Sequence, residues 1–178
     1  TKLMTALLVL EALDRDEIAL TDSVQISPRA AAMKGSQALL DASAVYPLED
    51  LLRTTIMASA NDSAVALSEY IAGSEENFVD RMNRRAAELG MTNTNYVNCT
   101  GYPQSGQYTT ARDVCRLCCE IAKHPRYNQY ASVWIDKLTH PGGRVTDLTN
   151  TNRLVRFYEG CDGYKTGSTD AAKYCLAA

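Results

Sequence analysis

The order of secondary-structure signals along the chain predicts an α/β fold, in which helices pack on an antiparallel sheet and an all-helical block is inserted. The chain opens on a strongly apolar helical run, continues through several helical patterns, and ends in short strand-like runs. Regular alternation of strands and helices would instead favour a parallel sheet. The inserted block is expected at about residues 28–123, with most strand signals after it.

The first helix is apolar on nearly all of its faces. Leu3, Leu7 and Leu10, with their neighbours, lead to a polar stop near residues 14–16. Helices of this composition are usually buried on most sides. A short strand is predicted at 24–27. The stretch that follows, 30–40, fits either helix or coil, with a turn expected at its middle.

The helical block carries start and stop signals typical of helices. Pro47, followed by two acidic residues, places a proline in a first turn and negative charge at the positive end of the helix dipole. That helix breaks near residues 59–62, where Asn61 or Asp62 can cap the next one. The expected helices run from Pro47 to the break, from the break to Gly73, from Ser74 to Gly90, and from Thr110 to before Pro125.

Short strand signals follow the helical block. We expect strands at 132–135 and 147–149, and then an antiparallel hairpin of 164–167 with 172–178. No repeat, low-complexity tract or linker divides the chain, so residues 1–178 are expected to form one domain. The chain starts inside a helical turn and stops inside a strand-like run, which predicts a domain that is incomplete at both termini.

Composition argues against several classes of protein. The net charge is −3 and the acidic and basic residues are interspersed, so no nucleic-acid partner is expected. No apolar run approaches the length of a membrane span. His124 and His140 stand beside prolines and no H-E-x-x-H motif is present, which argues against a metallopeptidase.

Six cysteines raise the question of disulfides or a metal site. Three follow helical spacing and are expected on a buried apolar face: Cys115, Cys118 and Cys119. The final hairpin would place Cys175 opposite about Tyr164 rather than opposite Cys161, so those two cysteines should not bridge. Cys99 has no identifiable partner. We therefore expect core residues or free thiols and no metal site.

A Lys-Thr-Gly tripeptide in the final hairpin carries a chemical signal. Because side chains alternate along a strand, Lys165 and Gly167 share one face of it. A cation beside a position without a side chain would let an extended substrate backbone lie against the strand. Two partners upstream strengthen this hypothesis: Ser59-x-Asn61 at the break between two helices, and Lys2 at the start of the first helix.

The order of these motifs resembles a known set. Penicillin-binding proteins and class A β-lactamases carry S-x-x-K, S-D-N and K-T-G motifs, and the partial matches here follow in that order. The surrounding sequence resembles the serine-type D-alanyl-D-alanine carboxypeptidases over five stretches: 1–13, 51–73, 88–95, 106–114 and 162–176. The resemblance implies a β-lactamase/transpeptidase-like fold.

The resemblance also implies a role for each matching residue. A nucleophilic serine needs a neighbouring base, and Lys2 would be that base once burial or a cation such as Lys165 lowers its pKa. The serine itself would lie three residues before Lys2, so we expect it to be missing from this chain. The other implied roles are proton relay for Ser59, positioning for Asn61, positive charge for Lys165, carboxylate binding for Thr166, backbone approach at Gly167, and half of the oxyanion hole from the N–H of Ser168.

The implied reaction removes the terminal D-alanine of peptidoglycan stem peptides through an acyl-enzyme, with no cofactor. β-Lactams would acylate the same serine. The enzyme would work outside the cytoplasmic membrane, in the cell wall or periplasm, and members of the family often carry a membrane anchor, which would lie in segments absent from this chain.

Two alternatives stay open. One is a β-lactamase of the same superfamily, although no E-x-x-L-N-like loop lies between Asn61 and Lys165, and Ala60 replaces the aspartate of S-D-N. The other is a non-catalytic peptidoglycan-binding module, in which the position three residues before Lys2 is not serine.

Overall fold

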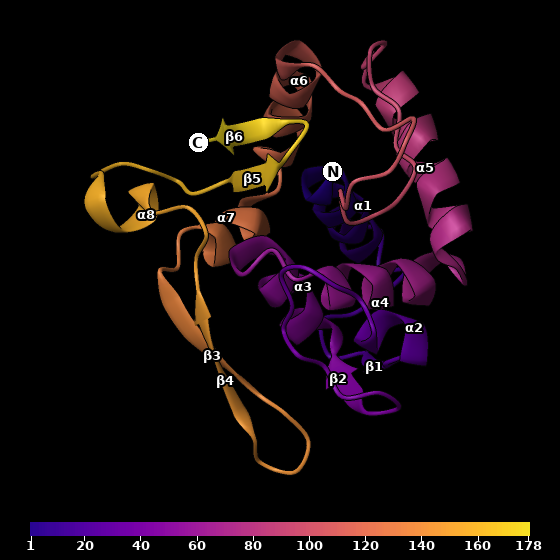
Figure 1. Cartoon of the computed structure of the whole chain (residues 1–178), viewed down its shortest axis with the longest axis vertical. Helices are drawn as coiled ribbons and strands as arrows, with labels where there is room; N and C mark the ends of the chain where they lie inside the picture. The colour runs from indigo at the N-terminus through magenta and orange to yellow at the C-terminus, as the bar shows by residue number, and fades with distance from the viewer.

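The computed structural model describes all residues of the chain, 1–178. Its strands pair in three separate two-stranded antiparallel sheets, β1 with β2, β3 with β4, and β5 with β6 (Figure 1). The predicted combination of helices with antiparallel strands is confirmed, although the strands form three small ladders. The elements are α1 (Lys2–Asp14), β1 (Ser23–Gln25), α2 (Pro28–Ala31), β2 (Val45–Pro47), α3 (Leu48–Met57), α4 (Asn61–Ala72), α5 (Glu75–Glu88), α6 (Ala111–Ile121), α7 (Pro125–Ala131), β3 (Ile135–Thr139), β4 (Val145–Thr149), α8 (Leu154–Phe157), β5 (Lys165–Thr169) and β6 (Lys173–Ala177).

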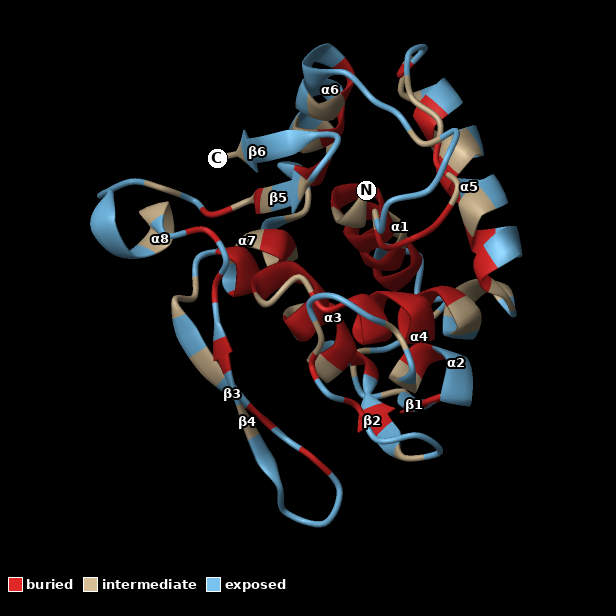
Figure 2. Cartoon of the chain, in the orientation of Figure 1, coloured by how far each residue is buried: buried red, intermediate tan, exposed pale blue.

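Helix α1 lies in the middle of the molecule and contacts α3, α4, α5, α6 and α7 (Figure 1). The predicted burial of this helix is confirmed: Met4 and Leu7 have no exposed surface, and buried residues gather on α1, α3 and α4 (Figure 2). Each fully buried side chain of this size contributes roughly 1.5–3 kcal/mol of transfer free energy. This packing fixes the first residue of α1, Lys2, at the edge of the core.

Helices α3 and α4 meet at the predicted break. α4 ends at Gly73 in the left-handed conformation that favours glycine, as expected. The prediction that Asn61 or Asp62 caps α4 is wrong, because the N-cap is Ala60 and no side chain caps the helix. Both polar side chains lie within the first turn and bond to other parts of the chain instead.

Helix α6 buries only one face, through Leu117 and Ile121. Cys118 lies beside that face and is half-buried, whereas Cys115 and Cys119 are exposed. The prediction of a buried position is therefore wrong for these two, because helical spacing places them on the opposite side of the helix from the buried residues.

The β5–β6 hairpin pairs Gly167 with Cys175, three positions from the expected pairing with Tyr164. All six cysteines are free thiols in the structure. Two short helices, α7 and α8, are absent from the sequence interpretation. Pro125 follows the end of α6 and is also the first residue of α7, because proline suits the first turn of a helix. No helix of the chain combines the length and apolar character needed to cross a bilayer.

Candidate active site

The side chain of Lys2, in the first turn of α1, contacts two hydrogen-bond acceptors that lie far along the chain. Its Nζ donates to Asn61 Oδ1 at 2.6 Å and to the carbonyl oxygen of Thr100 at 2.8 Å. Neither acceptor carries a charge, and Lys2 forms no ion pair. Lys2 is thus held in one orientation without a counterion.

Asn61, at the start of α4, is oriented by the segment before β2. Its Nδ2 donates to the carbonyl oxygen of Lys34 at 2.6 Å, and its backbone N–H donates to that of Ser36 at 2.7 Å. The first of these bonds requires the amide nitrogen to face Lys34, which leaves Oδ1 to face Lys2. Gly35 lies against this amide, where an added Cβ would be 2.8 Å from Nδ2.

Ser59 occupies the turn between α3 and α4 with a φ of 59°. The left-handed conformation costs a non-glycine residue roughly 1–2 kcal/mol, and such strain gathers at functional sites. The residue is half-buried. The turn places Ser59 two residues before the amide that holds Lys2.

Lys165, at the start of β5, is only 8% exposed. Its Nζ donates to Thr151 Oγ1 at 3.3 Å and to the carbonyl oxygen of Thr166 at 3.0 Å. The Thr166 hydroxyl also donates to Thr151 Oγ1, at 2.8 Å. Thr151 in turn donates its backbone N–H to the carbonyl oxygen of Met57, at the end of α3. Thr151 therefore ties β5 to the helix that leads into Ser59.

Burial shapes the electrostatics of both lysines. Desolvation lowers the pKa of Lys2 to about 8, against opposing effects of Cys99 and Asp62. Desolvation, followed by repulsion from Lys2, lowers the pKa of Lys165 to about 7. The repulsion that Lys2 exerts on Lys165 indicates that the two ammonium groups, 163 positions apart in sequence, lie near one another. A lysine with a pKa near neutrality can act as a base.

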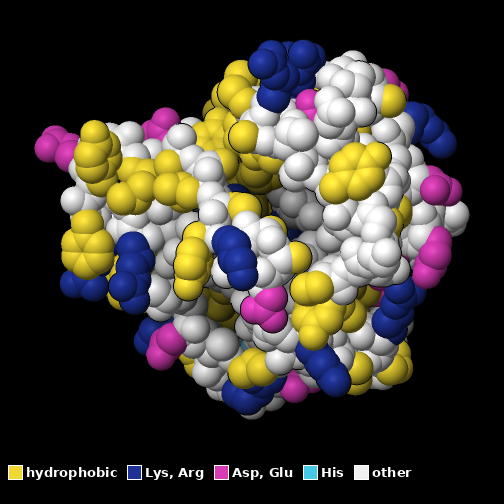
Figure 3. Space-filling model, turned by 45° about the horizontal axis from the view of Figure 1, so that its top comes forward, with side chains coloured by type: hydrophobic (Ala, Val, Ile, Leu, Met, Phe, Trp, Pro, Cys, Tyr) yellow, Lys and Arg dark blue, Asp and Glu magenta, His cyan; other side chains and the backbone are white.

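The remaining predicted residues lie on the open part of β5. Gly167 and Ser168 are exposed, and an added Cβ at Gly167 would meet nothing within 4 Å. Because β5 pairs only with β6, its other edge has free N–H and carbonyl groups. The amino end of α1 lies near β5 (Figure 1), and the face seen in Figure 3 is hollowed near its centre, with Lys or Arg atoms visible deep inside.

The structure therefore brings Lys2, Asn61 and Lys165 together, with Ser59 in the adjoining turn and Thr166 to Ser168 on the strand beside them. It adds partners that sequence reasoning missed: Thr151 and the carbonyl groups of Lys34 and Thr100. Thr151 stands in an Asn-Thr-Asn run between β4 and α8, a polar cluster that could have drawn attention to it.

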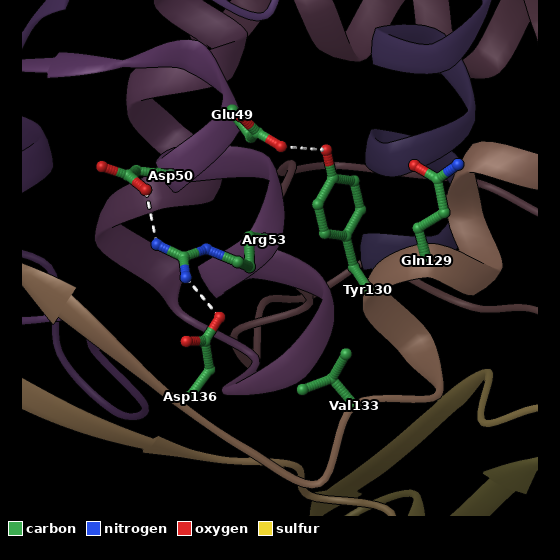
Figure 4. A pocket seen from close by; sticks show the side chains of 7 residues that line it. All are labelled: Glu49, Asp50, Arg53, Gln129, Tyr130, Val133 and Asp136. Atoms are coloured by element: carbon green, nitrogen blue, oxygen red, sulfur yellow. Dashed lines mark hydrogen bonds and ion pairs between the residues drawn. The ribbon is translucent and has the colours of Figure 1, made fainter.

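A separate hollow of about 390 Å³ lies between α3, α7 and the start of β3 (Figure 4). Arg53 bonds to both Asp50 and Asp136 there, and the Tyr130 hydroxyl donates to Glu49 at 2.9 Å. These charged groups are paired within the chain, so the hollow shows no catalytic arrangement. No cluster of His, Cys, Asp and Glu in the structure is arranged to hold a metal ion.

Comparison with known proteins identifies the family. The sequence profile described as D-alanyl-D-alanine carboxypeptidase matches residues 1–178. The chain belongs to this family. Among its D-alanyl-D-alanine carboxypeptidase relatives, DacF of Bacillus subtilis (strain 168) is 43% identical over 178 residues, which are all of this chain and 46% of that protein. DacC of Escherichia coli (strain K12) is 34% identical over 190 residues, covering all of this chain and 45% of that protein.

Solved structures agree with this family assignment. The D-alanyl-D-alanine carboxypeptidase DacD from Francisella tularensis matches with a TM-score of 0.93 at 28% identity, covering 98% of this chain and 54% of that one. Penicillin binding protein 5 from Haemophilus influenzae matches with a TM-score of 0.90 at 32% identity, covering 97% and 50%. The expected penicillin-binding-protein fold is confirmed. The chain spans about half the length of these D-alanyl-D-alanine carboxypeptidase relatives.

Proposed function

We propose that the protein containing this chain is a serine D-Ala-D-Ala carboxypeptidase, which removes the terminal D-alanine of peptidoglycan stem peptides. The observation that carries this proposal is the contact of Lys2 with Asn61 beside the buried Lys165. Three motif residues from distant parts of the chain meet there, and the family assignment supports the same chemistry.

The proposed mechanism begins with a serine three residues before Lys2. One helical turn places that serine and Lys2 on the same face of α1, so neutral Lys2 takes the hydroxyl proton as the oxygen attacks the penultimate D-alanine carbonyl. The backbone N–H of Ser168 and that of the serine stabilise the oxyanion, each donor contributing about 3–4 kcal/mol. Ser59 relays the proton to the leaving amine, and water then releases the shortened peptide.

Substrate binding is assigned to β5. The free edge of the strand accepts an extended peptide, and Lys165 with Thr166 binds its terminal carboxylate. Asn61 holds Lys2 and the substrate backbone. We further propose that residues 1–178 belong to one domain with a helical block at about 28–123. We also propose that β-lactams acylate the same serine and that the protein acts outside the cytoplasmic membrane.

Covalent labelling by a fluorescent penicillin tests the proposal. We expect the complete protein to be labelled, its Lys165→Ala variant not to be labelled, and residues 1–178 alone to remain unlabelled because the acylated atom lies before Thr1. Mass spectrometry of a defined pentapeptide should then show loss of one D-alanine. Retained labelling of the Lys165 variant would contradict its role, and rapid turnover of nitrocefin would favour a β-lactamase.

A further inference from the structure

Asp62 is a fully buried acidic residue that the mechanism above does not use. Its carboxylate accepts hydrogen bonds from the backbone N–H groups of Ala38 at 3.0 Å, Leu40 at 3.1 Å and Ser63 at 2.9 Å. Asp62 forms no ion pair with any Lys, Arg or His. A buried carboxylate without a cation is stabilised by such N–H donors. Breaking its hydrogen bonds to residues 38 and 40 would therefore leave a buried charge without partners, at a large cost in free energy.

Residues 34–40, the segment held by Asp62, form neither helix nor strand. The same segment supplies the carbonyl groups of Lys34 and Ser36 that bond to the side chain and backbone of Asn61. Two neighbouring residues of α4 thus grip one irregular segment, Asn61 at its beginning and Asp62 at its end. The segment has no regular structure of its own, so these bonds hold it in position together with the burial of Ala38 and Leu40 and a bond from Arg144 to the carbonyl oxygen of Leu39.

We propose that Asp62 is a positioning residue for the site: it anchors residues 34–40 on the start of α4 and thereby keeps Asn61 Oδ1 directed at Lys2. If the segment moves away, Asn61 Nδ2 loses its acceptor at Lys34, and only the bond from Lys2 still favours Oδ1 facing the ammonium group. A rotated amide would present its NH₂ group to the ammonium group, donor to donor, and would no longer orient Lys2. For catalysis, this inference rests on the proposed function.

The test compares the complete wild-type protein with Asp62→Asn and with a matched control, Asp113→Asn. Asp113 is also buried and also holds a neighbouring segment, accepting from the N–H of Asn93 at 2.9 Å and the hydroxyl of Thr94 at 2.8 Å. It lies on α6, and both variants replace one acceptor oxygen with a donor. A purely structural role would therefore affect the two proteins alike.

We expect Asp62→Asn to slow acylation by a fluorescent penicillin about tenfold to hundredfold, the range typical of a misplaced catalytic group, and Asp113→Asn to leave it within about twofold. The acid limb of the acylation pH profile should also move to lower pH in Asp62→Asn only, because the charge of Asp62 raises the pKa of Lys2. Hydrogen exchange measured by mass spectrometry should become faster at residues 34–40 in Asp62→Asn and not in the control.

Equal acylation by wild type and Asp62→Asn, or equal slowing in both variants, overturns the inference. If the wild-type protein is not labelled at all, the proposed function fails, and hydrogen exchange alone decides the role of Asp62: unchanged exchange at residues 34–40 overturns it. If Asp62→Asn does not fold, Gly35→Ala replaces it, since its Cβ would press on Asn61 Nδ2 from the same segment. If the Gly35→Ala protein is acylated at the same rate as the wild-type protein, the segment does not position Asn61.

Discussion

The positive charge of Lys2 acts on Lys165 inside the protein, and neither lysine has an acidic partner. Burial is the main cause of the lowered pKa values, about 8 for Lys2 and about 7 for Lys165. Two buried cations without a counterion weaken the folded state, and such arrangements cluster at functional sites. A substrate carboxylate beside Lys165 would raise its pKa again, so binding would restore the charge that the substrate needs.

Acylation of the complete protein by a β-lactam should become faster as the pH rises from about 6 towards the pKa of Lys2, about 8, because Lys2 accepts a proton only after losing its own. The two lysines interact, so the apparent pKa belongs to the pair. The second-order rate constant, measured from about pH 6 to about pH 10, checks this expectation. A rate that shows no rise on the acid side of this range would contradict Lys2 as the base, whereas a fall at higher pH would report loss of the Lys165 charge.

Replacing Lys165 with Met should stabilise the protein while abolishing acylation. The pKa of Lys165 is about 7 in the folded protein, against an ordinary value of 10.5. Between these two pH values the unfolded chain binds more protons than the folded chain, so the free energy of unfolding rises with pH. At pH 7 the variant should gain about 1–3 kcal/mol in free energy of unfolding, after allowance for lost hydrogen bonds. This advantage over the wild-type protein should shrink as the pH rises towards the ordinary pKa of lysine.

Urea unfolding of the complete protein at several pH values measures this effect. Lys137→Met is the matched control, because Lys137 is exposed on β3 and its replacement removes a charge that is already in water. A Lys165→Met protein that is less stable than wild type at neutral pH would show that the lysine is not held at a cost to the fold.

Gly163, two residues before Lys165, should tolerate no side chain. Its φ is +99°, and an added Cβ would lie 2.1 Å from the carbonyl oxygen of Ala131. We expect Gly163→Ala to lower the free energy of unfolding by about 3 kcal/mol or more. The backbone at the Ala131 contact must move, and an alanine at position 163 would also be strained by the positive φ. Gly142→Ala is the control: its φ is +88° but the space is open, so it should lose only about 1–2 kcal/mol. Similar losses in both variants would show that the contact with Ala131 is unimportant.

The positions of Lys2, Asn61 and Lys165 could be predicted because each stands at a feature visible in one sequence: a helix start, a helix break and a strand bounded by glycines. The carbonyl groups that orient them could not. Every residue carries a carbonyl, so residue type gives no signal, and Thr100 lies 98 positions from Lys2. Such contacts depend on how the loops are packed, which periodicity does not reveal.

The long helices were predictable for the same reason, since apolar spacing and capping residues act locally. The missed elements are short: α8 has four residues and no cap, and its apolar side chains do not repeat often enough to show a period. Cys115 and Cys119 show a further limit. Helical spacing identifies which residues share a face, but the packing of α6 against α1 decides which face is buried.

His140, which stands beside a proline, follows β3 in the β3–β4 connection and is nevertheless buried. Its Nδ1 lies 2.7 Å from the Tyr46 hydroxyl and its Nε2 lies 2.8 Å from Thr146 Oγ1. Arg144 also bonds to Asp41 at 2.8 Å. This cluster joins the β3–β4 turn to the segment before β2, the continuation of residues 34–40.

Acid should weaken this cluster through His140. Burial first, and the charge of Arg144 second, lower the pKa of His140 below its ordinary 6.5, against smaller opposing effects of Asp41 and Asp62. The unfolded chain therefore takes up the proton at a higher pH than the folded chain, so the stabilisation by neutral His140 is present above pH 6.5 and is lost as the pH falls below it.

We expect His140→Gln to be less stable than wild type at neutral pH and the difference to narrow in acid, measured by urea unfolding of the complete protein. His124→Gln, which changes the other histidine of the chain, should keep the contribution of His140 to the pH dependence. A difference between wild type and His140→Gln that stays constant from neutral to acidic pH would show that His140 does not titrate in this way.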